Sequence, residues 1–133
     1  MKKLALLFVV AVVTFTISPN LTYAHNYNGK DVLAFCIEGL RVIDSDESAN
    51  IEKSSECMGY IAASFDMYEL MTFVSKTPRT ICIQHGQVFL GQIVRVFVKY
   101  LKEHPNDLHK PAALLFWKAL SEAFPCPESQ PEK

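Results

Sequence analysis

Hydrophobic residues recur every three or four positions in the first half of the chain. This spacing is typical of a helix that buries one face, and it predicts a helix over about residues 30–43. Its apolar face consists of Leu33, Cys36, Ile37, Leu40 and Ile43. Residues 44–48 then form an acidic, hydroxyl-rich turn, which suits the start of the next helix through capping and through the helix dipole.

A second, longer helix is predicted over about residues 49–74. Small residues gather at its middle, at Gly59 and over 62–64. A glycine inside a helix costs about 1 kcal/mol relative to alanine, so we expect another helix to pack closely there or the helix to bend. Residues 75–80, which include Pro78, are expected to be a loop. The expected buried series of this helix is Cys57, Tyr60, Ile61, Phe65, Tyr68 and Met71 or Thr72.

The third predicted helix covers about residues 88–101, where ten of fourteen residues are apolar. Its charged and amide side chains lie three or four residues apart and form one narrow stripe. This polar stripe consists of Gln92, Arg95 and Lys99. We therefore expect this helix to be central and buried on most of its circumference. A strand is the alternative, because residues 94–98 are rich in β-branched side chains, but the length and the stripe favour a helix.

Prolines mark the limits of a fourth predicted helix. His104 and Pro105 end the third helix, because proline disfavours helical geometry in the residue before it. The fourth helix is expected to begin near residue 106 or 107, to hold Pro111 within its first turn or so, and to end at about Phe124, before Pro125. The predicted fold is therefore all-α: a small four-helix domain of two antiparallel hairpins.

Four cysteines are placed symmetrically about the turns of these hairpins. They allow three pairings, and spacing alone does not normally choose among them. In an antiparallel helix pair, however, residues equally far from the turn lie at the same height. The midpoint of Cys36 and Cys57 falls in the acidic turn, and that of Cys82 and Cys126 falls at position 104. We therefore predict two disulfides within the hairpins, each stabilising by about 3 to 4 kcal/mol in the chain-entropy model.

Residues 1–24 have the pattern of a secretory signal peptide. Lys2 and Lys3 precede an apolar run over 4–17, and short residues before position 25 supply a cleavage site. The run is short for a membrane span, so cleavage is favoured over a retained anchor. A lipoprotein is disfavoured because bulky Phe35 precedes the first cysteine. We predict an exported helical domain over 25–126, with no membrane association after cleavage, and a disordered tail over 127–133.

The charge balance argues against nucleic acid as a partner, and the residue spacing argues against metal and cofactor sites. Without Lys2 and Lys3, 11 basic residues face 14 acidic ones, a net charge of −3. Phosphate binding requires a clustered basic face, so we expect no nucleic-acid partner. Neither C-x-x-C nor H-x-x-x-H occurs in the sequence, and neither does a phosphate loop or a serine elbow. No metal and no cofactor are expected.

A nucleophilic cysteine beside His85 or His109 is the competing interpretation of the thiols. An even number of cysteines in an exported chain favours disulfides over this chemistry. Asp66 and Glu69 lie one helical turn apart, as is common on a solvated face, and His104 and His109 bracket a turn, where capping or solvation explains them. We expect no enzymatic activity.

Short motifs follow one another between residues 57 and 126. They are Cys57-Met58-Gly59-Tyr60-Ile61, Cys82-Ile83, Tyr100-Leu101, His104-Pro105, Leu108, Pro111-Ala112, Ala119-Leu120 and Ala123-Phe124-Pro125-Cys126. In order and spacing they resemble the Rap/Tai family of immunity proteins, which protect bacteria from peptidoglycan amidases delivered by type VI secretion. Ala63 and Gln84 depart from the family pattern, in which a glycine and a proline are common at these positions.

The resemblance implies a periplasmic inhibitor without catalytic activity of its own. Its partner would be a cysteine-dependent amidase that cuts the peptide stems of peptidoglycan, and the chain would occlude the catalytic cleft of that enzyme. The family also implies a helical fold that commonly forms a homodimer. The fourth predicted helix carries more apolar surface than one hairpin partner covers, in agreement with a second subunit there. Coverage by the second and third helices is the alternative.

Toxin-contacting residues do not follow from the motifs, because specificity depends on variable surface groups. One candidate patch is the acidic cluster of Asp44, Asp46 and Glu47, for which a solvated capping turn is the alternative. The other candidate is the polar stripe of the third helix. A carrier that encloses a small hydrophobic ligand between exported helices is the runner-up function, and a small cysteine hydrolase, which needs a free thiol, is a third.

Overall fold

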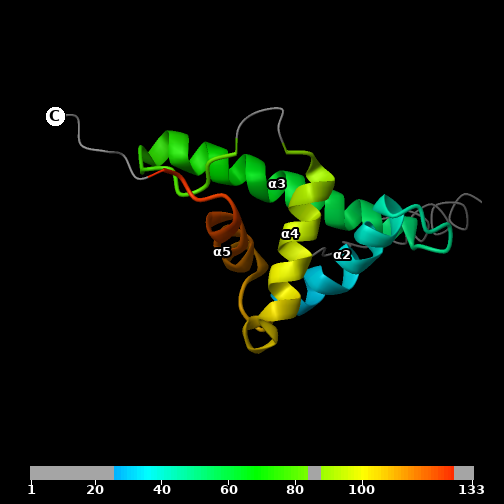
Figure 1. The fold of residues 1–133 in the computed structure, drawn as a ribbon. Helices are drawn as coiled ribbons and strands as arrows, with labels where there is room; N and C mark the ends of the chain where they lie inside the picture. The colour runs from blue at the N-terminus through cyan, green and yellow to red at the C-terminus, as the bar shows by residue number, and fades with distance from the viewer. Residues whose placement is uncertain (1–25, 84–87, 128–133) are drawn as a thin grey trace, which may run out of the picture.

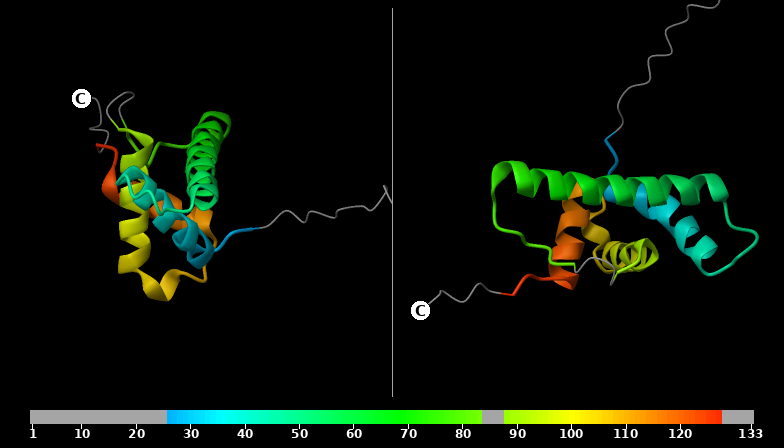
Figure 2. Two further views of the ribbon diagram at one scale, coloured as in Figure 1. Left: turned by 90° about the vertical axis from the view of Figure 1, so that its right-hand side faces the viewer. Right: turned by 90° about the horizontal axis from the view of Figure 1, so that it is seen from above.

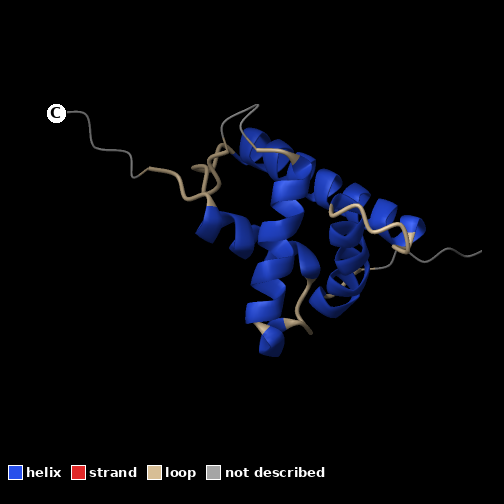
Figure 3. Cartoon of the chain, turned by 45° about the vertical axis from the view of Figure 1, so that its right-hand side comes forward, coloured by secondary structure: helices blue, strands red, loops and turns tan. Residues whose placement is uncertain are grey.

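The computed structural model describes residues 26–83 and 88–127; the expected signal peptide, residues 84–87 and the tail from residue 128 lie outside this part. The described chain forms the helices α2 (Gly29–Ile43), α3 (Ile51–Ser75), α4 (Leu90–Glu103) and α5 (Ala112–Ala123), with a short 3₁₀ helix, η1 (Pro105–Asp107), before α5 (Figures 1 and 3). Within the described ranges, extended pairing is limited to two isolated bridges. The predicted all-α fold of four helices is confirmed.

α3 spans the molecule from one end to the other, and the other helices pack against it or beside it (Figures 1 and 2). At 1.5 Å per residue its 25 residues measure about 37 Å. α2 joins it through a turn at one end, whereas α5 lies near its second half (Figure 1). The last turns of α3 project beyond α5 (Figure 2).

α4 is the central helix, as predicted. It contacts α2, α3 and α5, and the ring of Phe97 meets that of Phe116 of α5 edge to face, with ring centroids 5.4 Å apart. Its polar stripe of Gln92, Arg95 and Lys99 is exposed. This segment is therefore a helix that is buried on all but one stripe, and the alternative of a strand is wrong. The buried side chains of α4 are Ile93, Val94, Phe97, Val98 and Leu101.

The start of α2 is fastened to the chain just before α5. Asn28 caps α2, because its side chain accepts hydrogen bonds from two backbone N–H groups of the first turn. In return, the carboxylate of Asp31 accepts a hydrogen bond from the backbone N–H of Asn28. The backbone N–H of Gly29 donates to the carbonyl of Lys110 at 3.1 Å. A Cβ on Gly29 would lie 2.4 Å from a methyl carbon of Leu115. A side chain at this crossing would therefore have to displace Leu115 and press on the backbone of Leu108, 3.1 Å away.

The fourth helix begins later than the sequence predicted. Its start was expected near residue 106 or 107, whereas α5 begins at Ala112. Proline disfavours helical geometry in the residue before it, so Lys110 cannot extend a helix into Pro111. The chain therefore makes the single turn of η1, changes direction, and restarts as a helix only after Pro111. The expectation that Pro111 lies inside the first turn is wrong.

The cap of α3 also differs from the prediction. Asn50 is the capping residue, and its side-chain oxygen accepts a hydrogen bond from the backbone N–H of Lys53 at 2.9 Å. Residues 44–48 lie before this cap and are held by side chains of α2 and of the turn itself. The capping role expected of them is therefore wrong.

Both predicted disulfides are confirmed. Cys36–Cys57 joins the middle of α2 to α3, and Cys82–Cys126 joins the segment after α3 to the segment after α5, with Cα atoms 4.9 and 4.8 Å apart. Cys36 and Cys57 are completely buried, whereas Cys82 is exposed and Cys126 is half-buried. The two bridges use all four cysteines of the chain.

The close approach of α2 and α3 occurs at Gly39 and not at Gly59. A Cβ on Gly39 would lie 3.2 Å from Sγ of Cys57, whereas a Cβ on Gly59 would have no neighbouring atom within 4 Å. Gly59 lies on an exposed part of α3, so the close packing expected there is wrong. The small residue that admits the disulfide to the space between the helices is instead on α2.

Two alanine substitutions test this assignment. Gly59→Ala removes a helix penalty without meeting a neighbour, so we expect the free energy of unfolding to rise by about 0.5 to 1 kcal/mol. Gly39→Ala gains the same helix propensity but presses on a disulfide held by two helices, so we expect its free energy of unfolding to fall below that of the parent protein. Urea denaturation measures both. Equal stabilisation by the two changes would contradict the packing at Gly39.

The two disulfides are expected to be reduced in a fixed order. A thiolate must reach a sulfur to attack it, and only the bridge at Cys82 offers an exposed cysteine. Under mild dithiothreitol, Cys82–Cys126 should open in the folded protein while Cys36–Cys57 persists until the chain unfolds. Alkylation of the released thiols followed by peptide mass spectrometry gives the order. Loss of both bridges at one rate in the native protein would count against it.

Candidate protein-binding surfaces

The residues that carry the family resemblance build the fold. The ring of Tyr100 stacks on that of His104 with ring centroids 4.0 Å apart, and Nδ1 of His104 donates a hydrogen bond to the carbonyl of Tyr100. This contact ends α4, and Pro105 then opens η1. Pro111 and Pro125 lie in the two isolated backbone bridges that hold the segments flanking α5.

Two further motif residues lie on α3. The ring of Tyr60 meets the rings of Tyr27 and Phe35 edge to face, with centroids 5.7 and 6.2 Å apart. Burial raises the pKa of Tyr60 above its usual value. Gly59, in contrast, faces open space. Most of the motif is therefore explained by helix ends and packing, and toxin contacts have to be sought elsewhere.

Arg41 holds the turn between α2 and α3 in a single conformation. Its guanidinium donates hydrogen bonds to the carboxylates of Glu38 and Asp46 and to the hydroxyl of Ser48, at 2.7 to 2.9 Å. Asp46 also accepts hydrogen bonds from the backbone N–H and the hydroxyl of Ser48. Glu38 accepts another from the backbone N–H of Asn50, the cap of α3. One arginine thus links the end of α2 to the start of α3.

These hydrogen bonds favour the ionised form of two carboxylates. The hydroxyl and N–H of Ser48, together with Arg41, lower the pKa of Asp46 from 3.8 to about 2. The backbone N–H of Asn50 and the guanidinium of Arg41 hold the pKa of Glu38 below its usual value. The two acidic partners of Arg41 therefore keep their charge through neutral and mildly acidic pH.

The structure brings together the two polar patches that the sequence suggested. Arg95 of α4 donates a hydrogen bond of 2.5 Å to Asp44, which joins the polar stripe to the acidic turn. Gln92 uses its amide oxygen to accept from the backbone N–H of Phe89 at the start of α4. We call the combined patch the turn surface. It comprises Asp44, Asp46, Glu47, Gln92, Arg95 and Lys99, all of them exposed.

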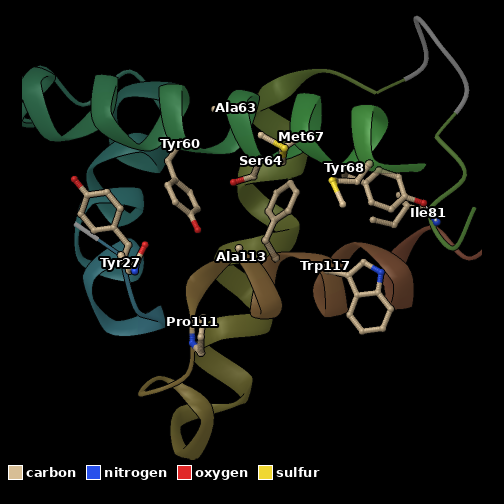
Figure 4. A pocket seen from close by; sticks show the side chains of 13 residues that line it. Tyr27, Tyr60, Ala63, Ser64, Met67, Tyr68, Ile81, Pro111, Ala113 and Trp117 are labelled. Carbon is tan, nitrogen blue, oxygen red and sulfur yellow. Dashed lines mark hydrogen bonds between the residues drawn. The ribbon is translucent and has the colours of Figure 1, made fainter. Parts of the chain in front are cut away.

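An apolar groove opens between α3 and α5, with a volume of about 630 Å³ (Figure 4). Tyr27 and Pro111 lie at one end, and Tyr68 and Trp117 lie at the other (Figure 4). None of its lining residues is charged at neutral pH. We call this hollow the α3–α5 groove. Its lining consists of Asn26, Tyr27, Tyr60, Ala63, Ser64, Met67, Tyr68, Met71, Ile81, Pro111, Ala113, Phe116 and Trp117.

One end of the groove is closed by the segment that follows α3. The hydroxyl of Tyr68 accepts hydrogen bonds from the backbone N–H groups of Thr80 and Ile81 at 3.0 and 2.9 Å. The hydroxyl of Thr80 accepts one from the indole N–H of Trp117 at 2.9 Å. The disulfide at Cys82 lies directly after this segment. The end wall is therefore held by α3, by α5 and by a covalent bond.

The second half of α3 exposes apolar side chains on several sides. Phe73 is 83% exposed, Val74 is 65% exposed, and Met67, Leu70 and Met71 are each exposed by more than half. The buried residues of this helix are confined to its first half and are Ser54, Cys57 and Ile61. We call residues 67–74 the projecting end of α3.

The surplus apolar surface is larger on α3 than on the helix where the sequence predicted it. On α5, the predicted fourth helix, Leu114 and Trp117 are 41% exposed and the other large residues are mostly buried. The buried series of the second helix was expected to end with Met71 or Thr72; Met71 is 55% exposed, whereas Thr72 is half-buried. The signal that could have found the projecting end is the run 70–74, apolar except for Thr72, which places side chains on more of the helix circumference than a single neighbouring helix covers.

The chemistry of the remaining candidates is limited. All four cysteines are in disulfides, so none is available as a nucleophile. His85 lies outside the described residues, and His109 is exposed. Glu69 is paired with Arg79, and Asp66 is exposed. Among the residues that the structure describes, no group of three histidine, cysteine or acidic side chains is placed to hold a metal ion.

In residues 26–83 and 88–127, no helix combines the length and the apolar character that a membrane span requires.

The acidity of Asp46 gives a direct test of the turn. Because its pKa in the folded protein is lowered to about 2 from 3.8, its hydrogen bonds stabilise the turn fully above about pH 4, and this stabilisation is lost as the pH falls through about 2. A carbon-13 NMR titration of the carboxyl groups should therefore show a midpoint near 2 for Asp46. In the Ser48→Ala variant the midpoint should move upward. A midpoint of 3.8 in the parent protein would contradict the network.

Comparison with known proteins assigns the chain to a family. A family model described as Rap1a immunity proteins matches residues 28–126, whereas no curated protein and no solved structure gives a significant match. The matched region begins at the cap of α2 and ends at Cys126, so it includes all four helices and both disulfides. This confirms the resemblance drawn from the sequence motifs. The chain belongs to the family of Rap1a immunity proteins.

Proposed function

We propose that this chain is exported to the periplasm, where it inhibits a peptidoglycan amidase effector of type VI secretion by occluding the active site. Family membership gives the general role of an immunity protein, which binds a cognate toxin. The order and spacing of the motifs in the sequence favour a cysteine-dependent amidase as that toxin. The homodimer implied by the same resemblance is part of the proposal.

The two disulfides are the observation that carries the compartment and the mode of action. Disulfides form and persist outside the reducing cytoplasm, and peptidoglycan lies in the same oxidising space. Both bridges fall inside the region matched by the immunity family. They also occupy the thiols that a cysteine hydrolase would need, which supports an inhibitor over that alternative. A covalently braced domain supports inhibition by binding.

We place the contact with the amidase at the turn surface. Arg41 fixes the turn before any partner arrives, so binding does not have to order it, and preorganisation of this kind raises affinity. Asp44 and Arg95 present opposite charges side by side, which gives a pattern that a complementary cleft rim can recognise. Charged groups at the rim of an interface act mainly on specificity and on the rate of association.

A carrier of small hydrophobic ligands is the second candidate function. The α3–α5 groove favours it, because an apolar hollow of about 630 Å³ lies within the usual size of ligand pockets. Native mass spectrometry of protein purified from the periplasm separates the two functions. A bound mass of lipid size supports the carrier, whereas an unloaded protein that silences an amidase supports the inhibitor.

The inhibitor function predicts complete loss of amidase activity at one chain per enzyme. The assay is release of peptide from purified peptidoglycan by a cysteine-dependent amidase effector of type VI secretion, measured while the folded, oxidised protein is added in increasing amounts. A bacterium with the same amidase directed to its periplasm should survive only when this chain is exported as well. Full activity in the presence of excess folded protein would rule out the function for that amidase.

A charge exchange tests the turn surface without breaking its ion pair. The double variant Asp44→Arg/Arg95→Asp keeps opposite charges next to each other but reverses their positions. We expect the melting temperature to stay near that of the parent protein and the rate of association with the amidase to fall about tenfold at low salt. Exchange of the pair before α5, Asp107→Lys/Lys110→Asp, is the matched control, because it lies outside both the turn surface and the projecting end of α3. Unchanged association in both variants would move the contact away from the turn surface.

A further inference from the structure

The projecting end of α3 has the character of a helix that is enclosed by other protein. Within residues 67–74, only Glu69 and Thr72 are neither aliphatic, sulfur-containing nor aromatic. A helix that is apolar on most of its circumference is normally buried. Here, however, Phe73 is the most exposed of the large apolar residues of the helix, and Val74 and Ile51 follow at 65% each. The single chain therefore leaves this segment without the cover that its composition requires.

The exposed side chains also follow the spacing of a helix–helix seam. Ala63, Met67, Leu70 and Val74 are separated by four, three and four residues, which is the repeat that packs one helix along another. All four are exposed. Neither α2, which packs on the first half of α3, nor α5, which lies across the groove, covers this row. A facing helix from outside the chain would complete it.

The α3–α5 groove lies beside this row and shares residues with it. Met67 and Ala63 belong to both, and Met71 lines the groove from the projecting end itself. The lining is uncharged, so two copies of this face meet without like-charge repulsion. Met and aromatic side chains at the rim are able to adjust to a neighbouring surface. One molecule thus carries both an apolar projection and an apolar hollow.

We infer that a second copy of this chain covers this face, with the projecting end of each α3 seated against the α3–α5 groove of the other across a two-fold axis. A two-fold contact uses the same patch on both copies, so it fills both hollows and covers both projections at once. The dimer belongs to the proposed function, and the new element is its location on α3, at the opposite end of the helix from the turn surface (Figure 1).

The exposed area agrees with such an interface. Aromatic side chains each offer about 150 to 250 Å². If about 200 Å² is taken for every residue of the face, the exposed fractions of Met67, Leu70, Met71, Phe73, Val74 and Trp117 together correspond to roughly 700 Å². A stable interface of standard size buries about 800 Å² on each partner. The largest apolar patch of an ordinary monomer is about 300 to 600 Å². The size of the face therefore fits a second protein copy better than a single small ligand.

Two matched substitutions on α3 test this location. Val74 and Ile51 are both β-branched, both 65% exposed, and lie at opposite ends of the helix. Val74→Lys and Ile51→Glu each place a charge that suits the helix dipole at its own end, so neither should unfold the helix. In analytical ultracentrifugation of the oxidised protein cleaved after residue 24, we expect a dimer for the parent and for Ile51→Glu, and a monomer for Val74→Lys.

A change on the other side of the contact tests the groove. Ala113 lines the groove from α5 and is exposed, so Ala113→Trp fills the hollow without altering the projecting end. We expect the dissociation constant of the dimer to rise at least tenfold, with an unchanged circular dichroism spectrum. Tighter association of Ala113→Trp would contradict insertion into the groove.

The remaining outcomes each overturn the assignment. If the parent protein is monomeric, or if the Val74→Lys variant still forms the dimer, no second copy covers this face. A monomer carrying a lipid-sized mass in native mass spectrometry gives the face to a ligand. If the parent protein is monomeric and the Val74→Lys variant no longer binds the amidase, this face contacts the amidase instead of a second copy. None of the sedimentation measurements contains the amidase, so the dimer location and the inhibitor function can fail separately.

Discussion

The buried disulfide between Cys36 and Cys57 is the constraint on which the rest of the molecule depends. It fixes α2 against the first half of α3 at a distance that leaves little room for a side chain at Gly39. With the two helices held there, Arg41 donates hydrogen bonds to Glu38, Asp46 and Ser48 together. These bonds hold the turn between α2 and α3. The same arrangement leaves the second half of α3 outside the reach of α2, so the helix ends as an apolar projection.

Helix positions and disulfide pairing could be predicted because each rests on a local or symmetric pattern. The stripe of Gln92, Arg95 and Lys99 identified the central helix. The acidic turn midway between Cys36 and Cys57 identified Cys57 as the partner of Cys36. The start of α5 was misplaced because Asn106 and Ala112 are both acceptable first residues, and the effect of Pro111 on Lys110 decides between them. What the sequence could not show is the backbone bond between Gly29 and Lys110, which fastens the segment before α5 to the start of α2. That contact joins segments about eighty residues apart.

The candidate surfaces were less predictable than the fold, since exposure depends on where neighbouring helices end. Met71 has the spacing of a core residue, and only the short reach of α2 and α5 in space leaves it exposed. Gly59 lies in a motif yet has no neighbour, whereas Gly39, outside the motif, makes the close contact. Asp44 and Arg95 were separate candidates along the chain, and the packing of α4 on α2 makes them one patch.

The order of the cysteines along the chain bears on how the protein matures. Each bridge joins consecutive cysteines, so a chain that is threaded through a membrane from its N-terminus presents Cys57 to Cys36 before Cys82 has emerged. An oxidase that pairs thiols as they appear therefore makes the native connectivity without a later reshuffling by an isomerase. The second bridge must await the passage of α5, so the end wall of the groove is the last part of the molecule to be locked.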